Sequence, residues 1–237
     1  MIIGIIAAMS QELTILNKEL SKIAKKTDIS ENLVVWNYLD HQIIITESGI
    51  GKVNSAINTY HLLQNYNLDL LINIGSVGAI SEEIKISSLF LVQQVFYYDV
   101  DLTAFDYKYG QLPKLPQAYN CIYEPWKKFS KNNNIMITNL ATGDSFINSV
   151  SQAQIIQENV GKKITIVDME CAAICQVAYL QQCPILVLKA VSDNVYHQLK
   201  NINQFNKSLD NISRKLAKIT LKLVTDIISK GRIEDNG

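Results

Sequence analysis

The sequence predicts an α/β fold in which helices cover both faces of a sheet, and three observations support this prediction. Short apolar, β-branched segments alternate with helix-like segments along nearly the whole chain, as strand–helix–strand units do. Ile2 to Ala7 is apolar throughout and Leu70 to Ile74 is apolar except for Asn73, which is typical of strands buried on both faces. The chain has 237 residues, 48% of them hydrophobic and 19% charged, so it can bury a substantial core. We expect a single domain over residues 1–237.

The elements of the first half follow from local patterns. Ile2 to Ala7 is a predicted strand, and Ser10 is a suitable N-cap for a helix that runs toward Lys25. The largely apolar segment Leu70 to Ile74 is a predicted strand that ends in a glycine-rich turn, Gly75 to Gly78. Between them we expect strands at 33–39 and 42–48 and a helix around 54–66.

The second half continues the alternation. Cys171 to Tyr179 consists of small and apolar residues without a polar face, which suits a helix packed inside the domain. The tail is an amphipathic helix whose apolar residues recur at spacings of three and four from Phe205 to Ile227. Strands are predicted at 87–98, 135–140, 164–167 and 184–191, and an aromatic loop at 99–113.

An acidic hinge, Asp168-Met-Glu170, lies between the strand at 164–167 and the helix that follows it. A carboxylate in this place lies at the carboxyl edge of a sheet, where open α/β folds bind ligands. Taken alone, Glu170 could equally serve only to balance the macrodipole of the following helix, an effect of about 0.3–1 kcal/mol.

Six predicted strand ends carry polar or glycine-rich residues. If these strands are parallel, their ends meet at one edge of the sheet. Each stretch also has a purely structural explanation, such as a helix cap, a helix dipole or a turn with positive φ. Their coincidence favours a pocket. The stretches are Glu12, Ser48–Gly51, Gly75–Gly78, Gly143–Ile147, Asp168–Glu170 and Ser192–Asp193.

The charge balance gives no support to a nucleic-acid or membrane-surface role. Lys plus Arg number 22 and Asp plus Glu number 22, so the formal charge is zero. No apolar run approaches the roughly 20 residues that span a bilayer. The apolar start of the chain is predicted to be a strand, because it lacks the basic flank and cleavage site of a signal peptide. We expect a cytoplasmic protein.

Metal and phosphate chemistry also find little support. The four cysteines have neither zinc-site nor disulfide spacing, so we expect buried thiols and no metal. The glycine-rich stretches match neither the dinucleotide nor the P-loop pattern. The only arginines, Arg214 and Arg232, are in the tail, so the pocket lacks an arginine clamp for phosphate. Lys52 and Lys189 are weaker candidates for that role.

Seven segments form one ordered set: Ile6–Glu12, Ser48–Val53, Asn73–Gly78, Phe105–Pro113, Gly143–Asn148, Met169–Glu170 and Ser192–Asp193. In order and spacing they resemble the 5′-methylthioadenosine/S-adenosylhomocysteine nucleosidases of the nucleoside phosphorylase-like superfamily. The resemblance implies a three-layer sandwich with a central mixed, largely parallel sheet flanked by helices. It also implies a homodimeric hydrolase that cleaves the N-glycosidic bond, releases adenine and a 5-thio-substituted ribose, and needs no metal and no organic cofactor.

The resemblance assigns roles to the acidic residues. Glu12 would be the general base that activates the attacking water, and Asp193 would deliver a proton to adenine N7. Glu170 would bind the ribose hydroxyls with help from the Met169 backbone. These residue types suit the chemistry, because the transition state carries positive charge on the sugar and negative charge on the purine.

The remaining roles concern binding. Phe146 would stack on adenine, the Ile147 backbone would read its Watson–Crick edge, and Ser76 would line the ribose end. The thioalkyl group would lie among Met9, Ile50, Phe105 and Tyr107, with Leu102 and Pro113 reaching in from the partner subunit.

Two positions depart from the family pattern. Ile202, in the lid segment, stands where the family commonly has an aromatic residue, which affects closure and thioalkyl preference. Lys189 stands where the family often has arginine, which affects the organisation of ribose or water. Two alternatives to the hydrolase are a purine nucleoside phosphorylase, which uses phosphate in place of water, and a nucleoside-binding protein without catalytic activity.

Overall fold

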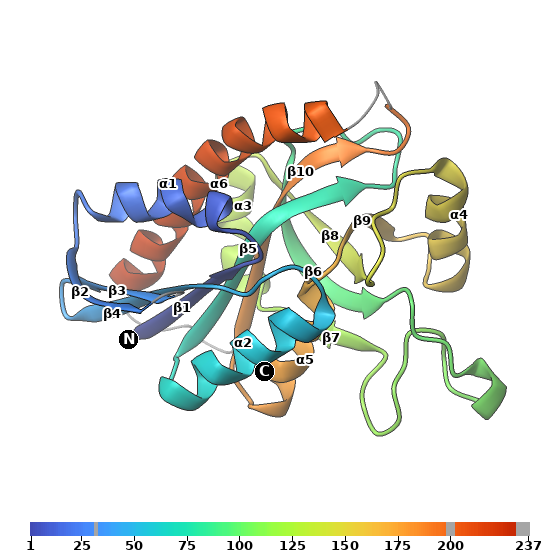
Figure 1. Cartoon of the computed structure of the whole chain (residues 1–237), viewed down its shortest axis with the longest axis horizontal. Helices are drawn as coiled ribbons and strands as arrows, with labels where there is room; N and C mark the ends of the chain where they lie inside the picture. Colours follow the sequence, from blue (N-terminus) through green and yellow to red (C-terminus); the bar gives the residue numbers. More distant parts are fainter. Residues whose placement is uncertain (31–32, 198–201, 231–237) are drawn as a thin grey trace.

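The computed structural model describes residues 1–30, 33–197 and 202–230, with side chains for 1–27, 33–197 and 209–230. Figure 1 shows a central sheet between two layers of helices. One face is covered by α1 (Ser10–Leu20), α3 (Lys127–Asn132) and α6 (Ile202–Lys230), the other by α2 (Lys52–Asn65) and α5 (Cys171–Leu180), and α4 (Val150–Asn159) lies at one end. The predicted fold class is confirmed.

The sheet is mixed and consists of two parallel sets of strands. The first set has the order β4 (His41–Glu47), β1 (Ile2–Ala7), β5 (Leu70–Ala79) and β10 (Ile185–Asn194). The second has the order β6 (Leu89–Tyr97), β8 (Ile135–Thr142) and β9 (Ile164–Asp168). Antiparallel pairs β10–β6 and β9–β5 join the sets, so five strands close into a ring.

Short antiparallel strands complete the sheet. The edge next to β4 is extended by β3 (Leu33–Tyr38) and then β2 (Lys25–Ser30), whereas β7 (Ala118–Asn120) pairs with β6. The connections between β6 and β8 include two short 3-10 helices, η1 (Thr103–Phe105) and η2 (Glu124–Trp126). Among the described residues, none of the helices has the length and apolar character that a membrane span requires.

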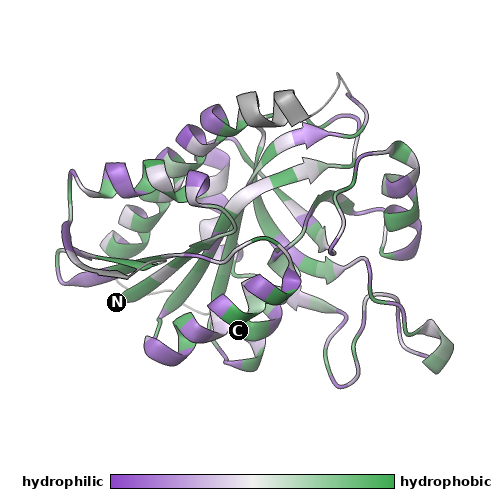
Figure 2. Ribbon diagram, in the orientation of Figure 1, coloured by the Kyte–Doolittle hydropathy of each residue, from purple (hydrophilic) through white to green (hydrophobic). Residues whose placement is uncertain are grey.

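The alternation of side chains along the strands divides the core between the two helical layers. Ile3 and Ile5 of β1 face the layer with α1 and α6, whereas Ile6 packs on the α2 and α5 side. In Figure 2, hydrophobic residues are frequent on the central strands and hydrophilic residues on the outer sides of the helices. Because both faces are covered, the strands can be apolar throughout.

Three predictions about the elements need correction. Met9 is the N-cap of α1 in place of Ser10, and the helix ends at Leu20, before β2. The sequence of β2 is polar because the strand lies at the edge of the sheet. The stretch Gly75–Gly78 is not a turn but the last part of β5, where it pairs with β10.

The strands whose ends carry the candidate site are also not all parallel. β9 runs antiparallel to β5, yet the two strands pair through their carboxyl-terminal residues, with Gly78 opposite Val167. The carboxyl ends of the two parallel sets therefore meet at one place, as expected, but they meet through an antiparallel pair that the sequence did not predict.

Candidate active site

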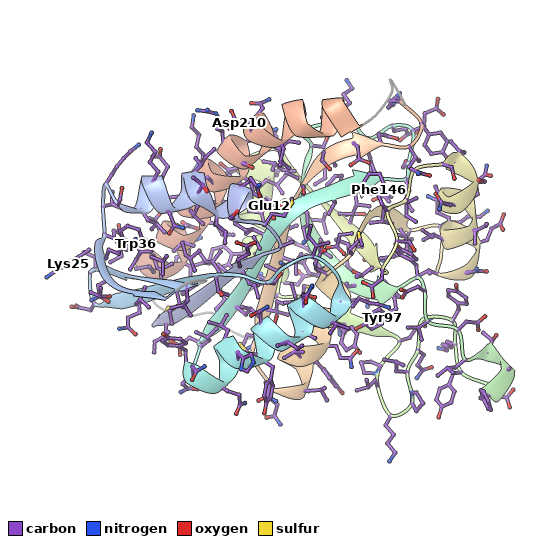
Figure 3. All side chains as sticks on the ribbon, viewed as in Figure 1. Glu12, Lys25, Trp36, Tyr97, Phe146 and Asp210 are labelled. Carbon is purple, nitrogen blue, oxygen red and sulfur yellow. The ribbon has the colours of Figure 1, made fainter. Side chains whose placement is uncertain are left out.

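A cavity of about 230 Å³ lies where the carboxyl ends of the two strand sets meet. Its walls come from the β1–α1 turn, the loop before α2, the last part of β5, the loop after β8, the β9–α5 turn and β10. Nine of the predicted site residues line it: Met9, Glu12, Ile50, Ser76, Phe146, Ile147, Met169, Glu170 and Asp193. Figure 3 labels two of them, Glu12 over the middle of the sheet and Phe146 toward α4.

Glu12 is buried in the first turn of α1. Its Oε1 accepts hydrogen bonds from the backbone N–H of Ser76 at 2.7 Å and from the Ser76 hydroxyl at 2.8 Å. Its Oε2 accepts a longer bond from the Met9 N–H at 3.3 Å. Burial raises the pKa of Glu12, while the bonds from Ser76 and the charge of Lys189 oppose the rise. The carboxylate thus bridges α1 and β5.

Asp193 is half-buried near the end of β10. Its Oδ1 accepts a hydrogen bond from the Ser192 hydroxyl at 2.7 Å. Burial raises the pKa of Asp193, and the bond from Ser192 opposes the rise. A carboxyl group in this state can hold a proton at a higher pH than an exposed aspartic acid does, as a general acid must.

Glu170 is the buried N-cap residue of α5. Its Oε1 accepts a hydrogen bond from the Gly51 N–H at 2.9 Å, and its Oε2 accepts one from the Met169 N–H at 3.3 Å. Burial and the neighbouring charge of Asp168 raise the pKa of Glu170 to about 7. The sequence left open whether Glu170 only balances the helix dipole. In the structure it also lines the cavity.

A buried ion pair that the sequence analysis did not foresee connects β10 to the β9–α5 turn. Lys189 Nζ lies 3.0 Å from Asp168 Oδ2, and both residues line the cavity. Burial alone would lower the pKa of Lys189, but the charges of Asp168 and Glu170 and the hydrogen bond to Asp168 are among the contributions that together outweigh it, and the pKa is raised. Asp168 Oδ1 also accepts a hydrogen bond from the Thr142 hydroxyl at 2.6 Å. The sequence carried one signal of this ion pair, a lysine within the otherwise apolar first part of β10.

Four predicted residues lie away from the cavity of this chain. Leu102, Phe105, Tyr107 and Pro113 belong to the stretch between β6 and β7, which extends from the body of the molecule around η1. None of them lines the cavity, and Phe105 is 71% exposed. The side chain of Ile202, the first residue of α6, is outside the described side chains.

The arrangement of the carboxyl groups is suited to proton transfer. Within the described part of the chain, His, Cys, Asp and Glu residues form no group of three that could hold a metal ion. Cys171 and Cys175 lie buried on α5 with their sulfurs 3.9 Å apart. Three carboxyl groups with raised pKa values instead face one cavity, which is typical of a site for general acid–base catalysis.

Comparison with known proteins agrees with this geometry. The model of the phosphorylase superfamily matches residues 2–225. A 5′-methylthioadenosine/S-adenosylhomocysteine nucleosidase of Staphylococcus aureus (strain bovine RF122 / ET3-1) is 37% identical over 196 residues, which are 81% of this chain and 86% of that protein.

Solved structures give the same result. The Streptococcus pneumoniae MTA/SAH nucleosidase in complex with 8-aminoadenine has a TM-score of 0.83 and 32% identity, covering 94% of this chain and 99% of the other. The Neisseria meningitidis nucleosidase in complex with methylthio-immucillin-A has a TM-score of 0.84 and 26% identity, covering 95% and 99%. The chain therefore belongs to the 5′-methylthioadenosine/S-adenosylhomocysteine nucleosidase family of the phosphorylase superfamily.

Proposed function

We propose that this protein hydrolyses the N-glycosidic bond of 5′-methylthioadenosine and S-adenosylhomocysteine. The products are adenine and either 5-methylthioribose or S-ribosylhomocysteine. The observation that carries the proposal is the placement of Glu12, Glu170 and Asp193 around one cavity. Relatives of the same family are named as nucleosidases of 5′-methylthioadenosine and S-adenosylhomocysteine, and the structure of one contains 8-aminoadenine.

The proposed reaction assigns a proton transfer to each of two carboxyl groups. Glu12 accepts a proton from a water molecule as the water oxygen bonds to C1′ of the ribose. The electron pair of the C1′–N9 bond moves to the purine, and Asp193 delivers its proton to N7. Bond formation, bond cleavage and both proton transfers then balance, and the purine leaves as neutral adenine.

Glu170 and its neighbours hold the sugar in this account. The Glu170 carboxylate binds the ribose hydroxyls and stabilises the positive charge that develops on the ring. The Met169 backbone assists, and Ser76 lines the ribose end beside Glu12. Met9 and Ile50 supply apolar contacts for the thioalkyl group. Phe146 stacks on adenine and the Ile147 backbone contacts its Watson–Crick edge.

Water suits this cavity better than phosphate as the nucleophile. Among the described residues that line it, Lys189 is the only lysine or arginine, and Asp168 already neutralises it at 3.0 Å. A phosphate dianion would enter beside the carboxylates of Glu12 and Glu170, which repel it. A purine nucleoside phosphorylase is therefore the less favoured alternative.

We also propose that the active form is a homodimer. Exposed apolar side chains gather on α2 and at the end of α5, namely Val53, Ile57, Tyr60, Tyr179 and Leu180, and the two helices pack against each other. An apolar face of this kind is costly to leave in water. A second copy would cover it, and Leu102, Phe105, Tyr107 and Pro113 would then reach the cavity of the partner.

Further parts of the proposal concern the whole chain. We propose that residues 1–237 form one domain, because α1 and α6, near opposite ends of the sequence, pack on each other. We propose a cytoplasmic enzyme of nucleoside catabolism and methionine salvage, because the reaction frees the purine and the thio-substituted ribose for separate reuse.

The substrate assignment is tested with a panel of nucleosides. Purified protein is incubated with 5′-methylthioadenosine, S-adenosylhomocysteine, deoxyadenosine and a futalosine-type nucleoside, and free base is measured by chromatography. The proposal predicts the highest kcat/KM for the first two nucleosides. Preference for the futalosine-type nucleoside would contradict the substrate assignment, and release from none of them would favour a binding protein.

A further inference from the structure

Three charged residues outside the proposed reaction connect two of the loops that supply the cavity wall. Lys52 Nζ lies 2.6 Å from Asp99 Oδ2 and 3.8 Å from Asp144 Oδ2. The same Asp99 Oδ2 accepts a hydrogen bond from the Asp144 backbone N–H at 2.9 Å. Lys52 begins α2, Asp99 follows β6, and Asp144 follows β8. The cluster therefore ties together three segments that are far apart in the sequence.

The first turn of α2 depends on carboxylates from other segments. Its N-cap residue is Gly51, which has no side chain to cap the helix. The Gly51 N–H donates to Glu170 Oε1 at 2.9 Å, and the Lys52 N–H donates to Asp144 Oδ1 at 2.8 Å. Two N–H groups that a helix leaves without an internal partner are thus satisfied from the β9–α5 turn and the loop after β8.

The loop after β8 is fixed from a second side by Tyr98. The Tyr98 hydroxyl donates to the Gly143 carbonyl at 2.9 Å and also to the Ser145 carbonyl. A Cβ atom on Gly143 would lie 2.5 Å from the Tyr98 ring, so only glycine fits beside it. Phe146 and Ile147, two residues of the cavity wall, follow directly. Their placement therefore depends on Tyr98 and on Asp144.

The cluster links two segments of the cavity wall. Ile50 lies just before Lys52, and Phe146 lies just after Asp144. The Lys52 ammonium also lies 5.5 Å from the centre of the Tyr97 ring, and Figure 3 labels Tyr97 beside the first turn of α2. A displacement of one loop would break the ion pair, the backbone bond at Asp144 and the cap of α2 together.

We propose that Lys52, Asp99 and Asp144 are positioning residues that couple the loop before α2 to the loop after β8 and thereby set the affinity for the nucleoside. The effect on nucleoside affinity rests on the proposed function, whereas the coupling between the two loops does not. The side chains of Lys52 and Asp99 are 23% and 25% exposed. Solvent screens such a pair only in part. A network of three charged groups stabilises the contact between the loops more than an isolated surface ion pair would.

The kinetic test compares Lys52→Met and Asp99→Ala with a matched control, Lys22→Met. Lys22 forms an exposed ion pair of 2.6 Å with Glu19, away from the cavity. We expect the two cluster variants to raise KM about threefold to tenfold, as the loss of a small charge network does, with kcat within about twofold of the parent protein. The control should leave both constants unchanged. An unchanged KM in Lys52→Met, or an equal rise in the control, would overturn the inference.

The structural test needs no substrate. Amide hydrogen exchange is measured on the ligand-free protein over residues 50–56 and 143–147. Lys52→Met should accelerate exchange in both stretches, and Lys22→Met in neither. Acceleration confined to residues 50–56 would overturn the coupling. A protein that shows the coupled exchange but releases no adenine would refute the proposed function and leave the coupling standing.

Discussion

Glu12 and Asp193 are two carboxyl groups in one cavity that the proposed reaction requires in opposite protonation states. Burial raises the pKa of both. Glu12 accepts three hydrogen bonds and lies near the positive charge of Lys189, all of which favour the ionised form of a base. At Asp193, only the hydrogen bond from Ser192 opposes the rise in pKa that burial causes. Different surroundings can thus separate a general base from a general acid.

Removing either proton-transfer group should slow the chemical step. We expect Glu12→Gln and Asp193→Asn each to lower kcat by a factor of about 10² to 10⁴, equivalent to roughly 3–5 kcal/mol of barrier. Direct binding of 5′-methylthioadenosine, measured by calorimetry, should persist because both variants keep the size of the side chain. A kcat of either variant within tenfold of the parent protein would remove that residue from the mechanism.

Glu170 gives the protein a pH-dependent stability. Its pKa is raised to about 7 from the ordinary value of 4.5, so the folded state binds this proton more tightly than the unfolded chain. Stability therefore falls as pH rises from about 4.5 through 7, by on the order of a few kcal/mol. Glu170→Gln cannot ionise and escapes this loss.

The measurement is a pair of thermal unfolding curves at pH 5 and pH 8. The Tm of Glu170→Gln relative to the parent protein should increase by several degrees between the two pH values. Glu19→Gln, at a partly exposed position on α1 outside the cavity, serves as the control. A Tm difference that does not change with pH would contradict the account of Glu170.

At the scale of elements, the Lys189–Asp168 pair holds β10 against the β9–α5 turn. Both side chains are buried, and Asp168 also receives the N–H of Cys171 at 3.2 Å. Lys189→Met leaves the charge of Asp168 without its partner, which should cost about 3–5 kcal/mol of unfolding free energy. Urea unfolding measures this loss. The double variant with Asp168→Asn should recover part of it, and a single variant as stable as the parent would show that the pair contributes little.

The sequence predicted the strands better than their arrangement. β1, β5 and β9 were evident because their sequences are rich in apolar and β-branched residues, as those of buried strands are. The strand β2 was missed because its edge position permits Lys25, Lys26 and Thr27. The end-to-end meeting of β5 with β9, and the pairing of Lys189 with Asp168, depend on contacts between distant segments. Such contacts leave no local pattern in the sequence. The motifs therefore predicted most of the residues that line the cavity, but not the strand pairing and the ion pair that hold its walls together.

At the scale of the whole molecule, the exposed face of α2 is the feature that a single chain leaves unexplained. Ile57 is 50% exposed there. We expect the protein to elute as a dimer of about twice 26.7 kDa, and Ile57→Glu to shift it toward monomer and lower its activity, because a buried charge disfavours the interface.

Light scattering coupled to gel filtration measures this shift. Ile155→Glu is the matched control, since Ile155 is 55% exposed on α4, away from that face. Ile155→Glu should remain dimeric and active. A parent protein that is monomeric at micromolar concentration and fully active would contradict the contribution of Leu102 and Pro113 from a partner.

The central claim is that the carboxyl groups of this cavity direct a water molecule to the glycosidic carbon. Its most direct test follows 5′-methylthioadenosine in buffer with and without phosphate, with both products identified by mass. We predict adenine and free methylthioribose at the same rate in the two buffers. A phosphate-dependent rate with methylthioribose 1-phosphate as the product would contradict the claim.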